Sequence, residues 1–585
     1  MRMFDGVRRV FLSLAVEGIV GFVILPMLGN PHEPKLSIAQ GEPPSSFSAK
    51  ADTPSTSAPV VDDNPLGEAM ELARRGDWDA AIKKYQQVIQ ERPKSPDAYA
   101  GIARCYLKKK DVLQAYETVT KGLQVSDAWP VRVALGEVYF RQGKITEAEK
   151  EWVGVIKSGH AAARAYFGLA RVRWAIRMNK TAKTLIDKAH ELDPKDPDIQ
   201  RSWIGTLRRS DQIKYYEESL AGASDLDADQ RRRMQEHLVY LKERAQPNSR
   251  PCRLASKLTN TETPLVRLLI DPKHLRGYGL SVALNGIRVN LMLDTGASGI
   301  VVRRHIAEKA RINKIVETKV GGVGDGGLKG AYVGTADTIG IGELEFQNCP
   351  IEVLESRSVA NEDGLIGADV FAEFLVEIDF PHEKLKLSEL PKRPGEEDQK
   401  LALKSDDDDS DDPEKPKAEK PDKTEAARPT ALGGNSSGPQ DRYVAPEMQS
   451  FTRVYRFGHQ LLVPTKIGDV PEKLFVLDTG AFTNGISPDA AREVTKVQGS
   501  DTIVKGISGS VKKVYRADKA VLQFGHLRQE NQDMLSFDTT SISNSAGTEI
   551  SGFLGFALLR FLDIKIDYRD ALVDFMYAPK PFGAF

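Results

Sequence analysis

Cysteine is scarce in this sequence. The 585 residues contain three cysteines, Cys105, Cys252 and Cys349, and no two of them form a CxxC pair. They fall in different segments, which argues against a zinc site and against a disulfide framework. We therefore expect all three to be free thiols, mostly buried.

The sequence also lacks an excess of charge of either sign, since 81 Lys and Arg residues balance 82 Asp and Glu residues. No long basic stripe occurs, so the composition gives no indication of a nucleic-acid partner. Apolar residues make up 41% of the chain, which is enough for packed cores. At roughly 100–200 residues per domain, a chain of this length predicts three or four units.

An apolar stretch, Val10–Leu28, follows three arginines near the N-terminus. A basic segment followed by an apolar one is typical of an export signal. The stretch is borderline for a spanning helix, which needs about 20 apolar residues, and Glu17 interrupts it. We interpret residues 1–30 as a signal peptide or an uncleaved membrane anchor; a misassigned start or a buried helix is the alternative. The expected location is therefore exported, membrane-anchored, periplasmic or extracellular.

Two segments have compositions that do not favour a packed structure. Residues 31–61 are rich in Pro, Ser, Thr and Ala, and residues 391–442 are charged and rich in proline. Neither offers enough apolar surface to offset the cost of ordering the chain. We interpret them as a disordered tether and a disordered charged linker. The acidic run at 406–412 lacks the loop pattern of a calcium site.

Residues 62–246 show a helical pattern with an internal repeat. Small residues recur at steps of 33 or 34 positions in two series that stay in phase: Ala81, Ala115, Ala148 and Ala182, and Ala69, Ala103, Gly136 and Ala170. This pattern resembles the tetratricopeptide repeat, in which two helices cross closely and need small side chains at the contact. The resemblance implies a solenoid with capping helices. We expect a protein partner on its concave surface; an intramolecular brace is the alternative.

After Pro247 the apolar period changes from that of helices to that of strands. Alternating apolar residues flank Asn285-Gly286, and an Asn-Gly pair between two such runs predicts a tight hairpin. Strand-like patterns occupy residues 263–390 and return at 443–585.

The two strand-rich units share more than their period. The letters LDTGA occur in both, with Asp294 in the first copy and Asp478 in the second. Further along, each unit contains two apolar residues followed by a glycine. Asp294 to Gly367 spans 73 positions, and Asp478 to Gly555 spans 77.

Each unit resembles a retropepsin-like aspartic protease lobe, the single-lobe type found in retroviral proteases and their bacterial relatives. The resemblance covers about 265–390 and 455–580. It implies a multidomain chain in which an all-α tetratricopeptide-repeat solenoid precedes two all-β retropepsin-like acid protease lobes. It also implies an aspartic endopeptidase that hydrolyses peptide or protein substrates with water as the nucleophile. No metal or organic cofactor is expected.

Hydrolysis of a peptide bond needs a carboxylate that takes a proton from water and a carboxylic acid that hydrogen-bonds the carbonyl oxygen. Two carboxyl groups about 3 Å apart share one proton. One lobe supplies one aspartate, so two lobes must face each other. We expect Asp294 and Asp478 to meet within one chain. The alternatives are a homodimer in which each aspartate meets its own copy, and a non-catalytic scaffold.

The resemblance assigns roles to the residues beside the aspartates. Thr295 and Thr479 would exchange hydroxyl hydrogen bonds between the lobes. Gly296 and Gly480 would let the backbone approach the carboxylates, which a Cβ would obstruct.

Two further pairs are predicted to support the loops. Gly367 and Gly555 would lie behind them, where the strand passes too close for a side chain. Ala297 and Ala481 stand where many acid proteases carry a hydroxyl that lowers the carboxylate pKa. We therefore expect activity at mildly acidic to near-neutral pH.

A glycine-containing hairpin in each unit is a candidate flap that closes over substrate. The candidates are Val320–Gly330 and Val504–Lys513, which favours a plan with two flaps. Their glycines are Gly321, Gly322, Gly324, Gly506 and Gly509. The second unit has Phe482 where the first has Ser298, so a degenerate second lobe is an alternative.

Overall fold

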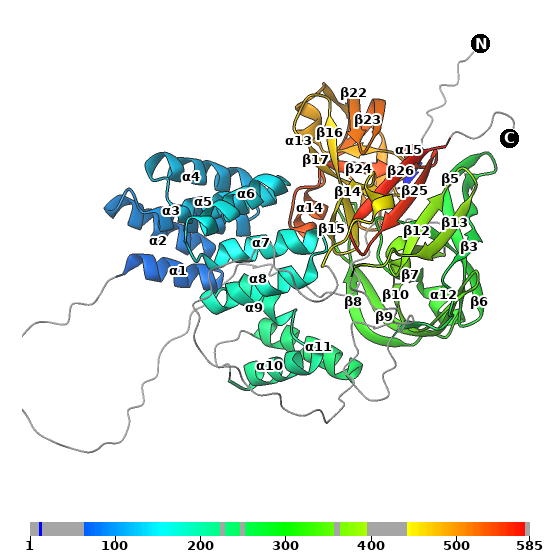
Figure 1. The fold of residues 1–585 in the computed structure, drawn as a ribbon, viewed down its shortest axis with the longest axis horizontal. Helices are drawn as coiled ribbons and strands as arrows, with labels where there is room; N and C mark the ends of the chain where they lie inside the picture. Colours follow the sequence, from blue (N-terminus) through cyan, green and yellow to red (C-terminus); the bar gives the residue numbers. More distant parts are fainter. Residues whose placement is uncertain are drawn as a thin grey trace, which may run out of the picture.

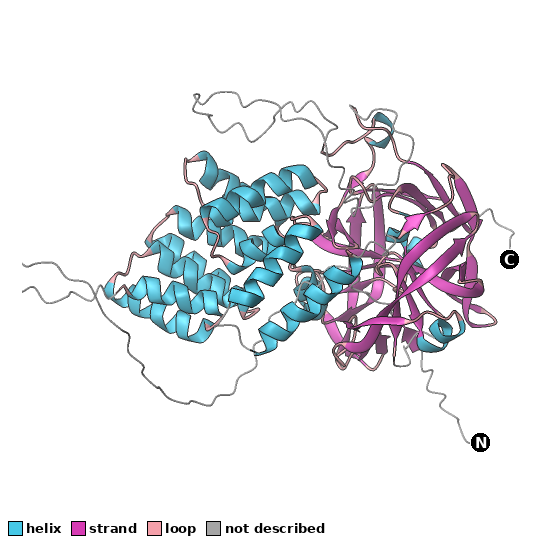
Figure 2. Cartoon of the chain, turned by 90° about the horizontal axis from the view of Figure 1, so that it is seen from below, coloured by secondary structure: helices cyan, strands magenta, loops and turns pink. Residues whose placement is uncertain are grey.

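The computed structural model describes residues 11–13, 64–222, 228–245, 252–355, 363–394 and 441–578. A helical region and a strand-rich region lie side by side (Figures 1 and 2). The predicted tether and nearly all of the predicted charged linker lie outside the described residues.

The predicted N-terminal signal or anchor also lies outside them, apart from a short stretch of backbone. That stretch is strand β1 (Phe11–Ser13), which pairs in parallel with β20 (Ile503–Gly506). In the described ranges, no helix has both the length and the apolar character needed to cross a membrane.

The helical region is built from consecutive helices that pack in pairs. Their bounds are α1 (Pro65–Arg75), α2 (Trp78–Glu91), α3 (Pro96–Lys108), α4 (Val112–Val125), α5 (Trp129–Arg141), α6 (Ile145–Lys157), α7 (Ala163–Ala175), α8 (Asn179–Leu192), α9 (Pro197–Ile204), α10 (Arg209–Gly222) and α11 (Ala228–Arg244). The helical repeat predicted from the sequence is confirmed.

Small residues at the helix contacts make room for large neighbours, as the repeat pattern predicts. The four alanines of the first series are fully buried. A Cβ added to Gly136 or Gly168 would lie 2.5 or 2.4 Å from the ring of Trp152. Glycine at both positions therefore lets the buried Trp152 of α6 fill the space between α5 and α7.

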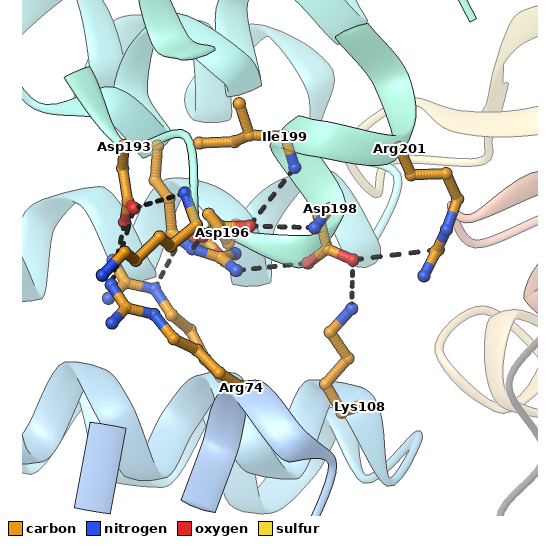
Figure 3. A network of polar contacts seen from close by, with 11 residues as sticks. Arg74, Lys108, Asp193, Asp196, Asp198, Ile199 and Arg201 are labelled. Carbon is orange, nitrogen blue, oxygen red and sulfur yellow. Dashed lines mark hydrogen bonds and ion pairs between the residues drawn. The ribbon is translucent and has the colours of Figure 1, made fainter. Parts of the chain in front are cut away.

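A network of charged side chains connects successive repeats (Figure 3). Arg164 of α7 pairs with Glu137 of α5 and with Asp196 and Asp198 at the start of α9. Lys108 of α3 reaches the same Asp198. Burial alone would raise the pKa of Asp198, but the two cations hold that pKa well below its usual range. The network therefore fixes α3, α5, α7 and α9 relative to one another.

The first strand-rich lobe comprises the described residues of 252–394. Its elements are β2 (Arg253–Leu254), β3 (Thr261–Pro264), β4 (Val266–Asp271), β5 (His274–Leu284), β6 (Ile287–Asp294), β7 (Ile300–Arg303), α12 (Arg304–Lys309), β8 (Lys314–Val320), β9 (Lys329–Ile341), β10 (Leu344–Leu354), β11 (Gly364–Gly367), the 3₁₀ helix η1 (Ala368–Phe371), β12 (Phe374–Asp379) and β13 (Lys384–Glu389). Its main sheet runs β2-β10-β7-β11-β6-β5-β9-β8, and β4 pairs with β5.

The hairpin predicted at Asn285-Gly286 is confirmed. β5 ends at Leu284 and β6 begins at Ile287, and the two turn residues have φ of 47° and 84°. Asparagine and glycine tolerate these positive φ values better than other residues do, which is why the pair favours this turn.

The prediction of free thiols was wrong for two of the three cysteines. Cys252 and Cys349 form a disulfide, whereas Cys105 is a buried free thiol. The two bonded cysteines are 97 positions apart, and they meet because β2 pairs with β10. That strand pairing is a tertiary contact, so cysteine spacing alone could not reveal it.

The second lobe comprises residues 441–578. Its elements are the 3₁₀ helix η2 (Pro446–Met448), β14 (Thr452–Arg453), β15 (Tyr455–Phe457), β16 (Gln460–Ile467), β17 (Lys473–Asp478), β18 (Gly485–Ile486), α13 (Pro488–Arg492), β19 (Val497–Ser500), β20, β21 (Gly509–Ser510), β22 (Val514–Phe524), β23 (Leu527–Phe537), α14 (Thr540–Ala546), β24 (Gly552–Gly555), α15 (Phe556–Leu559), β25 (Leu562–Asp567) and β26 (Leu572–Tyr577). Its main sheet runs β15-β16-β17-β24-β18-β23-β22-β19.

A further sheet joins the two lobes. It runs β14-β26-β25-β12-β13-β3, and its centre is the antiparallel pair of β12 from the first lobe and β25 from the second. Figure 1 shows these green and red strands side by side. One buried apolar core extends through both lobes, so the lobes form a single packed unit within one chain.

The helical region is seated on the second lobe. Arg141 at the end of α5 donates to the carbonyl oxygen of Ser543 (2.7 Å), and the Thr548 hydroxyl donates to the carbonyl oxygen of Phe140 (2.7 Å). The ring of Phe140 meets Phe457 of β15 edge-on, with centroids 5.9 Å apart. Figure 1 shows α14 at this junction. The end of helix α5, in the middle of the helical region, therefore contacts the second lobe within the chain.

Candidate active site

The two predicted aspartates occupy equivalent places in their lobes. Asp294 ends β6, Asp478 ends β17, and each strand pairs in parallel with a strand that ends in glycine. Gly367 of β11 lies opposite Asp294, and Gly555 of β24 lies opposite Asp478. Each carboxyl group therefore leaves the same edge of its own sheet.

The structure brings the two carboxyl groups together. The side chains of Asp294 and Asp478 are in hydrogen-bonding contact, and the residues are 0% and 3% exposed. A Cβ on Gly296 would lie 2.8 Å from Cγ of Asp478. Glycine is thus required where the loop of the first lobe touches the aspartate of the second.

Backbone N–H groups hold one oxygen of each carboxyl group. Gly296 N–H donates to Oδ1 of Asp294 (2.8 Å). Gly480 and Ala481 N–H donate to Oδ1 of Asp478 (2.9 and 2.8 Å). In the part of the chain that the structure describes, Oδ2 of Asp294 accepts from no N–H or O–H group. Two carboxylates have no donor between them, so their contact requires one shared proton.

Burial raises the pKa of Asp294 to about 6, although the hydrogen bonds from Gly296 and Asp478 act in the opposite direction. Loss of water favours the neutral form of a carboxyl group. The pair is therefore suited to keep one proton at mildly acidic pH.

Two threonines connect the loops of the two lobes. Thr295 N–H donates to Oγ1 of Thr479, and Thr479 N–H donates to Oγ1 of Thr295, both at 3.0 Å. Each hydroxyl in turn donates to a carbonyl oxygen of the opposite lobe, that of Leu477 or Leu293. These reciprocal bonds are buried and nearly symmetric, so they fix the two loops relative to each other.

The glycines opposite the aspartates lie directly behind the loops. A Cβ on Gly367 would be 2.5 Å from the carbonyl oxygen of Ala297, and one on Gly555 would be 3.0 Å from that of Ala481. The close approach explains why each lobe has glycine at the end of this strand.

The loops are supported differently in the two lobes, by side chains that the sequence reasoning missed. In the first lobe, Asp369 accepts hydrogen bonds from the Ser298 hydroxyl (2.7 Å) and from Gly299 N–H (2.9 Å). In the second, Asn484 accepts from Gly555 N–H (2.8 Å). Phe482 stands in the second lobe where the first lobe has Ser298, so it cannot make the bond that Ser298 makes to Asp369. Asn484 supports the loop of the second lobe instead. The sequence offered one indication of this support, namely that Asp369 follows Gly367 by two positions.

His459 also contacts the candidate site without any sequence signal. It lies in the turn between β15 and β16, and its Nε2 is 3.0 Å from the carbonyl oxygen of Gly296. A carbonyl only accepts, so Nε2 carries the proton. Burial lowers the pKa of His459, with Asp369 opposing that effect. A turn of the second lobe thus holds the active-site loop of the first.

The two candidate flaps contact each other at their tips. Gly326 N–H donates to the carbonyl oxygen of Ser508 (2.7 Å), and Ser508 N–H donates to that of Val323 (3.1 Å). Gly322 N–H donates to the Ser508 hydroxyl (2.9 Å). A Cβ on Gly324, whose φ is +127°, would lie 2.5 Å from the carbonyl oxygen of Gly509. These glycines allow direct backbone contact between the tips.

The predicted flap glycines are distributed over both tips. Gly321, Gly322 and Gly324 lie in the connection between β8 and β9, whereas Gly506 ends β20 and Gly509 begins β21. Flap residues Val323 and Ile507 share one buried apolar cluster with Ala297 and Ala481. The structure therefore shows the site in a closed arrangement.

An acidic group outside the site does not make a convincing metal centre. Carboxyl oxygens of Glu377, Asp379 and Asp563 lie within 4.8 Å of one another in the shared sheet. Lys386 pairs with the first two, and Lys565 pairs with Glu377. The cluster is thus an ion-pair network, and we assign no metal to it.

Comparison with known proteins gives matches in both regions. Residues 280–370, in the first lobe, match the aspartyl protease family model. Residues 72–127 and 133–197 match tetratricopeptide-repeat models. The chain carries an aspartyl protease-type domain and tetratricopeptide repeats.

Similar curated proteins match over a short part of their length. DNA damage-inducible protein 1 of Neurospora crassa is 33% identical over 108 residues, 17% of this chain and 22% of that protein. Its namesake in Chaetomium globosum is 31% identical over 114 residues, 18% and 23% of the two chains. The chain thus spans less than a quarter of these relatives.

Two solved structures show weak likeness to parts of the chain. A tetratricopeptide-repeat protein of Thermus thermophilus is 22% identical, covers 30% of this chain and 98% of its own, and gives a TM-score of 0.25. An aspartic proteinase of Irpex lacteus is 11% identical, covers 55% of this chain and 98% of its own, and gives a TM-score of 0.32.

Proposed function

We propose that the protein is an aspartic endopeptidase whose catalytic pair is Asp294 and Asp478. The observation that carries this proposal is the buried contact between two carboxyl groups, one from each protease-type lobe of a single chain. The reciprocal threonine bonds support it, because they hold both loops in the geometry that the contact needs.

The chemistry follows from a pair that shares one proton. One carboxylate takes a proton from a water molecule, whose oxygen attacks the carbonyl carbon of the peptide bond. The other carboxyl group donates its proton to the carbonyl oxygen. Collapse of the tetrahedral intermediate breaks the C–N bond, and a proton passes to the leaving amine. Two carboxyl groups in contact supply both roles without a third group.

A peptide library tests the proposal. The wild-type protein is incubated with the library between pH 4 and 7, and the products are identified by mass spectrometry. The control is the double variant Asp294→Asn/Asp478→Asn, in which both acids become neutral amides. We expect cleavage by the wild type and none by the variant. Equal cleavage by both proteins, or none by either, would contradict the proposal.

The shared sheet favours pairing within one chain over the homodimer alternative. The central contact of that sheet joins β12 and β25 of the same chain, and a homodimer of like lobes would have to break it. The non-catalytic scaffold alternative is disfavoured by the intact pair of carboxyl groups in contact.

We further propose that the repeats bind a protein partner or a protein substrate. The helices α1 to α4 lie away from the protease-type lobes (Figure 1). Leu113 and Tyr116 on α4 are exposed. Substitution of both by Asp should lower kcat/KM for a protein substrate and leave that for a short peptide unchanged; an equal effect on both substrates would contradict this role.

Export to an oxidising compartment is our proposal for location. It is supported by the Cys252–Cys349 disulfide, since disulfides persist mainly outside the reducing cytosol, and by the basic and apolar N-terminal sequence. Thiol labelling of the protein from fractionated cells should find Cys105 as the reactive cysteine after denaturation. Labelling of all three cysteines in a cytosolic fraction would contradict the proposal. Whether residues 1–30 also tether the protein to a membrane is tested by the same fractionation.

A further inference from the structure

Glu352 of β10 is a buried carboxyl group that the proposed chemistry does not use. It is 3% exposed, and within the described residues its Oε2 has no hydrogen-bond partner. Burial raises the pKa of Glu352 to about 8, and no neighbouring charge or hydrogen bond contributes. A buried polar atom without a partner is costly, so Oε2 of Glu352 is a candidate position for contact with a ligand.

The strand register places Glu352 on the face of the sheet that carries the candidate site. Glu352 lies opposite Val301 of β7, and Val301 lies opposite Leu365 of β11. Side chains of directly opposite residues are on the same face. Val301 and Leu365 belong to the buried cluster that contains Ala297 of the active-site loop and Val323 of the first flap.

The neighbours of Glu352 along β10 are on the other face. Ile351 and Val353 belong to the large core shared by the two lobes. Glu352 is therefore excluded from that core by the alternation of the strand. Its side chain is on the face of the sheet that carries Val301 and Leu365.

The cation on the adjacent strand is already engaged. Arg303 of β7 lies opposite Leu354, on the same face as Glu352, and its Nη2 is 3.8 Å from Oδ1 of Asp363. No ion pair between Arg303 and Glu352 occurs in the described residues. Among the described residues, no cation pairs with Glu352, and a basic side chain of a substrate would supply one.

The second lobe provides an internal comparison. Val301 lies seven positions after Asp294, and Gly485 lies seven positions after Asp478. Gly485 lies opposite Leu535 of β23, just as Val301 lies opposite Glu352. Leu535 is 4% exposed and belongs to the same buried cluster as the flap residues.

The equivalent positions of the two lobes thus carry an acid in the first and a leucine in the second. A structural requirement of the lobe would be met by leucine in both, as the buried Leu535 shows. The fold of the lobe therefore does not require an acid at this position.

We propose that Glu352 lines a subsite of the first lobe that accepts a lysine or arginine side chain of the substrate, whereas Leu535 gives the second lobe an apolar subsite. The inference rests on the proposed function and names its substrate class: peptides with a basic residue on one side of the scissile bond and an apolar residue at the equivalent place on the other. Glu352 is a specificity-determining residue in this account.

The energetics favour a cation over an apolar side chain at this subsite. A basic side chain shifts Glu352 toward its carboxylate form and pairs with it through a charge-assisted hydrogen bond, which is stronger than a neutral one. Because the free group is mostly protonated below pH 8, this preference for a cation should grow as the pH rises. An apolar side chain would leave the carboxyl group buried and unpaired, at a cost. A site built around a buried polar group discriminates strongly against a ligand that lacks the matching group.

Matched substrates test the inference. Pairs of peptides differ at one position by lysine or norleucine, which has a similar length but no ammonium group. For the wild type we expect kcat/KM to favour lysine by about 10- to 100-fold at one position on one side of the cleaved bond, from a charge-assisted bond of about 1.5–3 kcal/mol. The ratio should fall to near one in Glu352→Gln and reverse in favour of norleucine in Glu352→Leu.

A reverse variant guards against a change in folding. Leu535→Glu should create a second preference for lysine, on the opposite side of the cleaved bond. Glu352→Gln keeps the shape of the side chain, so a lost ratio in a folded variant reports the lost ability to ionise against a cation. Cleavage by the wild type with equal rates for lysine and norleucine, or an unchanged ratio in Glu352→Gln, overturns the inference and leaves the proposed function standing. No cleavage of any peptide by the wild type overturns both.

Discussion

Ala297 and Ala481 stand beside the two aspartates, and neither offers a side-chain donor to a carboxylate. Burial raises the pKa of Asp294 to about 6. The proposed active form holds one proton on the pair, so kcat/KM should fall as the pH rises through about 6. The absence of hydroxyl donors and the burial of the pair act in the same direction, toward activity at mildly acidic rather than strongly acidic pH.

Ala297→Ser should move the alkaline side of the pH–rate profile to lower pH. The added hydroxyl can donate to the carboxylate, and a hydrogen bond of about 0.5–1.5 kcal/mol lowers a pKa by about 0.5–1 unit. The buried Ala336 offers the matched control Ala336→Ser, which should leave the profile in place. A wild-type profile that peaks near pH 2, or a profile unmoved by Ala297→Ser, would contradict this account.

Asp294→Asn should stabilise the fold at neutral pH while removing activity. The folded-state pKa of Asp294, about 6, is above the unfolded value of about 3.9. The folded state therefore binds more protons between these values, and stability is lost as the pH rises from about 4 to 6. An amide does not ionise, so the variant gains on the order of 2 kcal/mol at pH 7 and little at pH 4.

Denaturant unfolding at the two pH values measures this difference. Asp489→Asn is the control, since that side chain is 91% exposed. A loss of stability in Asp294→Asn that is the same at pH 4 and pH 7 would show that the aspartate is not held at a raised pKa.

At the scale of elements, the two flap hairpins are held together by their tips. Asp325 takes part twice: its N–H donates to the carbonyl oxygen of Ser510 (3.2 Å), and its Oδ2 accepts from Lys512 N–H (2.7 Å). Both aspartates of the candidate site are buried, so the flaps must separate before a peptide can enter.

Asp325→Ala should make this separation more frequent. Loss of one hydrogen bond of about 0.5–1.5 kcal/mol raises the open population by roughly 2- to 10-fold. Hydrogen exchange of the tip amides of Gly326 and Ser508 should accelerate by that factor. Asp325→Asn keeps an acceptor oxygen and is expected to behave like the wild type. Unchanged exchange in Asp325→Ala would mean that this contact does not hold the flaps closed.

The elements also show what the sequence could and could not predict. The hairpin at Asn285-Gly286 and the helical repeats were predictable, because turn chemistry and periodic small residues are local signals. The two DTGA segments predicted the loops that carry Asp294 and Asp478, because in both units the same letters stand at a similar distance before a glycine. Each of these features depends on residues that are close in sequence or repeated within it.

Other features depend on contacts between distant strands. The disulfide needed the pairing of β2 with β10, and the contact of His459 with Gly296 needed the lobes to be docked. Glu352 reads in the sequence as one acidic residue among many. Its burial follows from the packing of the lobe, and its correspondence to Leu535 follows from the strand register.

At the scale of the whole molecule, the disulfide and the shared sheet hold distant segments together. The Cys252–Cys349 bond closes a loop of 97 positions that includes most of the first lobe. Closing a loop of that size restricts the unfolded chain, and native disulfides typically contribute about 2–4 kcal/mol.

Cys252→Ala/Cys349→Ala should therefore lower the free energy of unfolding by about 2–4 kcal/mol. The measurement is denaturant unfolding of the wild type and the variant, each with and without a reducing agent. The reducing agent should destabilise the wild type alone. Equal behaviour of the two proteins under oxidising conditions would show that the bond does not form in solution.

The central claim is that Asp294 and Asp478 act as one pair within one chain, and single substitutions test it most directly. Asp294→Asn and Asp478→Asn are each assayed on the same peptide library, separately and after mixing. We predict that either substitution alone abolishes every cleavage and that mixing restores none. If each variant kept a share of the wild-type cleavage sites, each lobe would be working with its own copy in a second chain, and the intrachain pair would be contradicted.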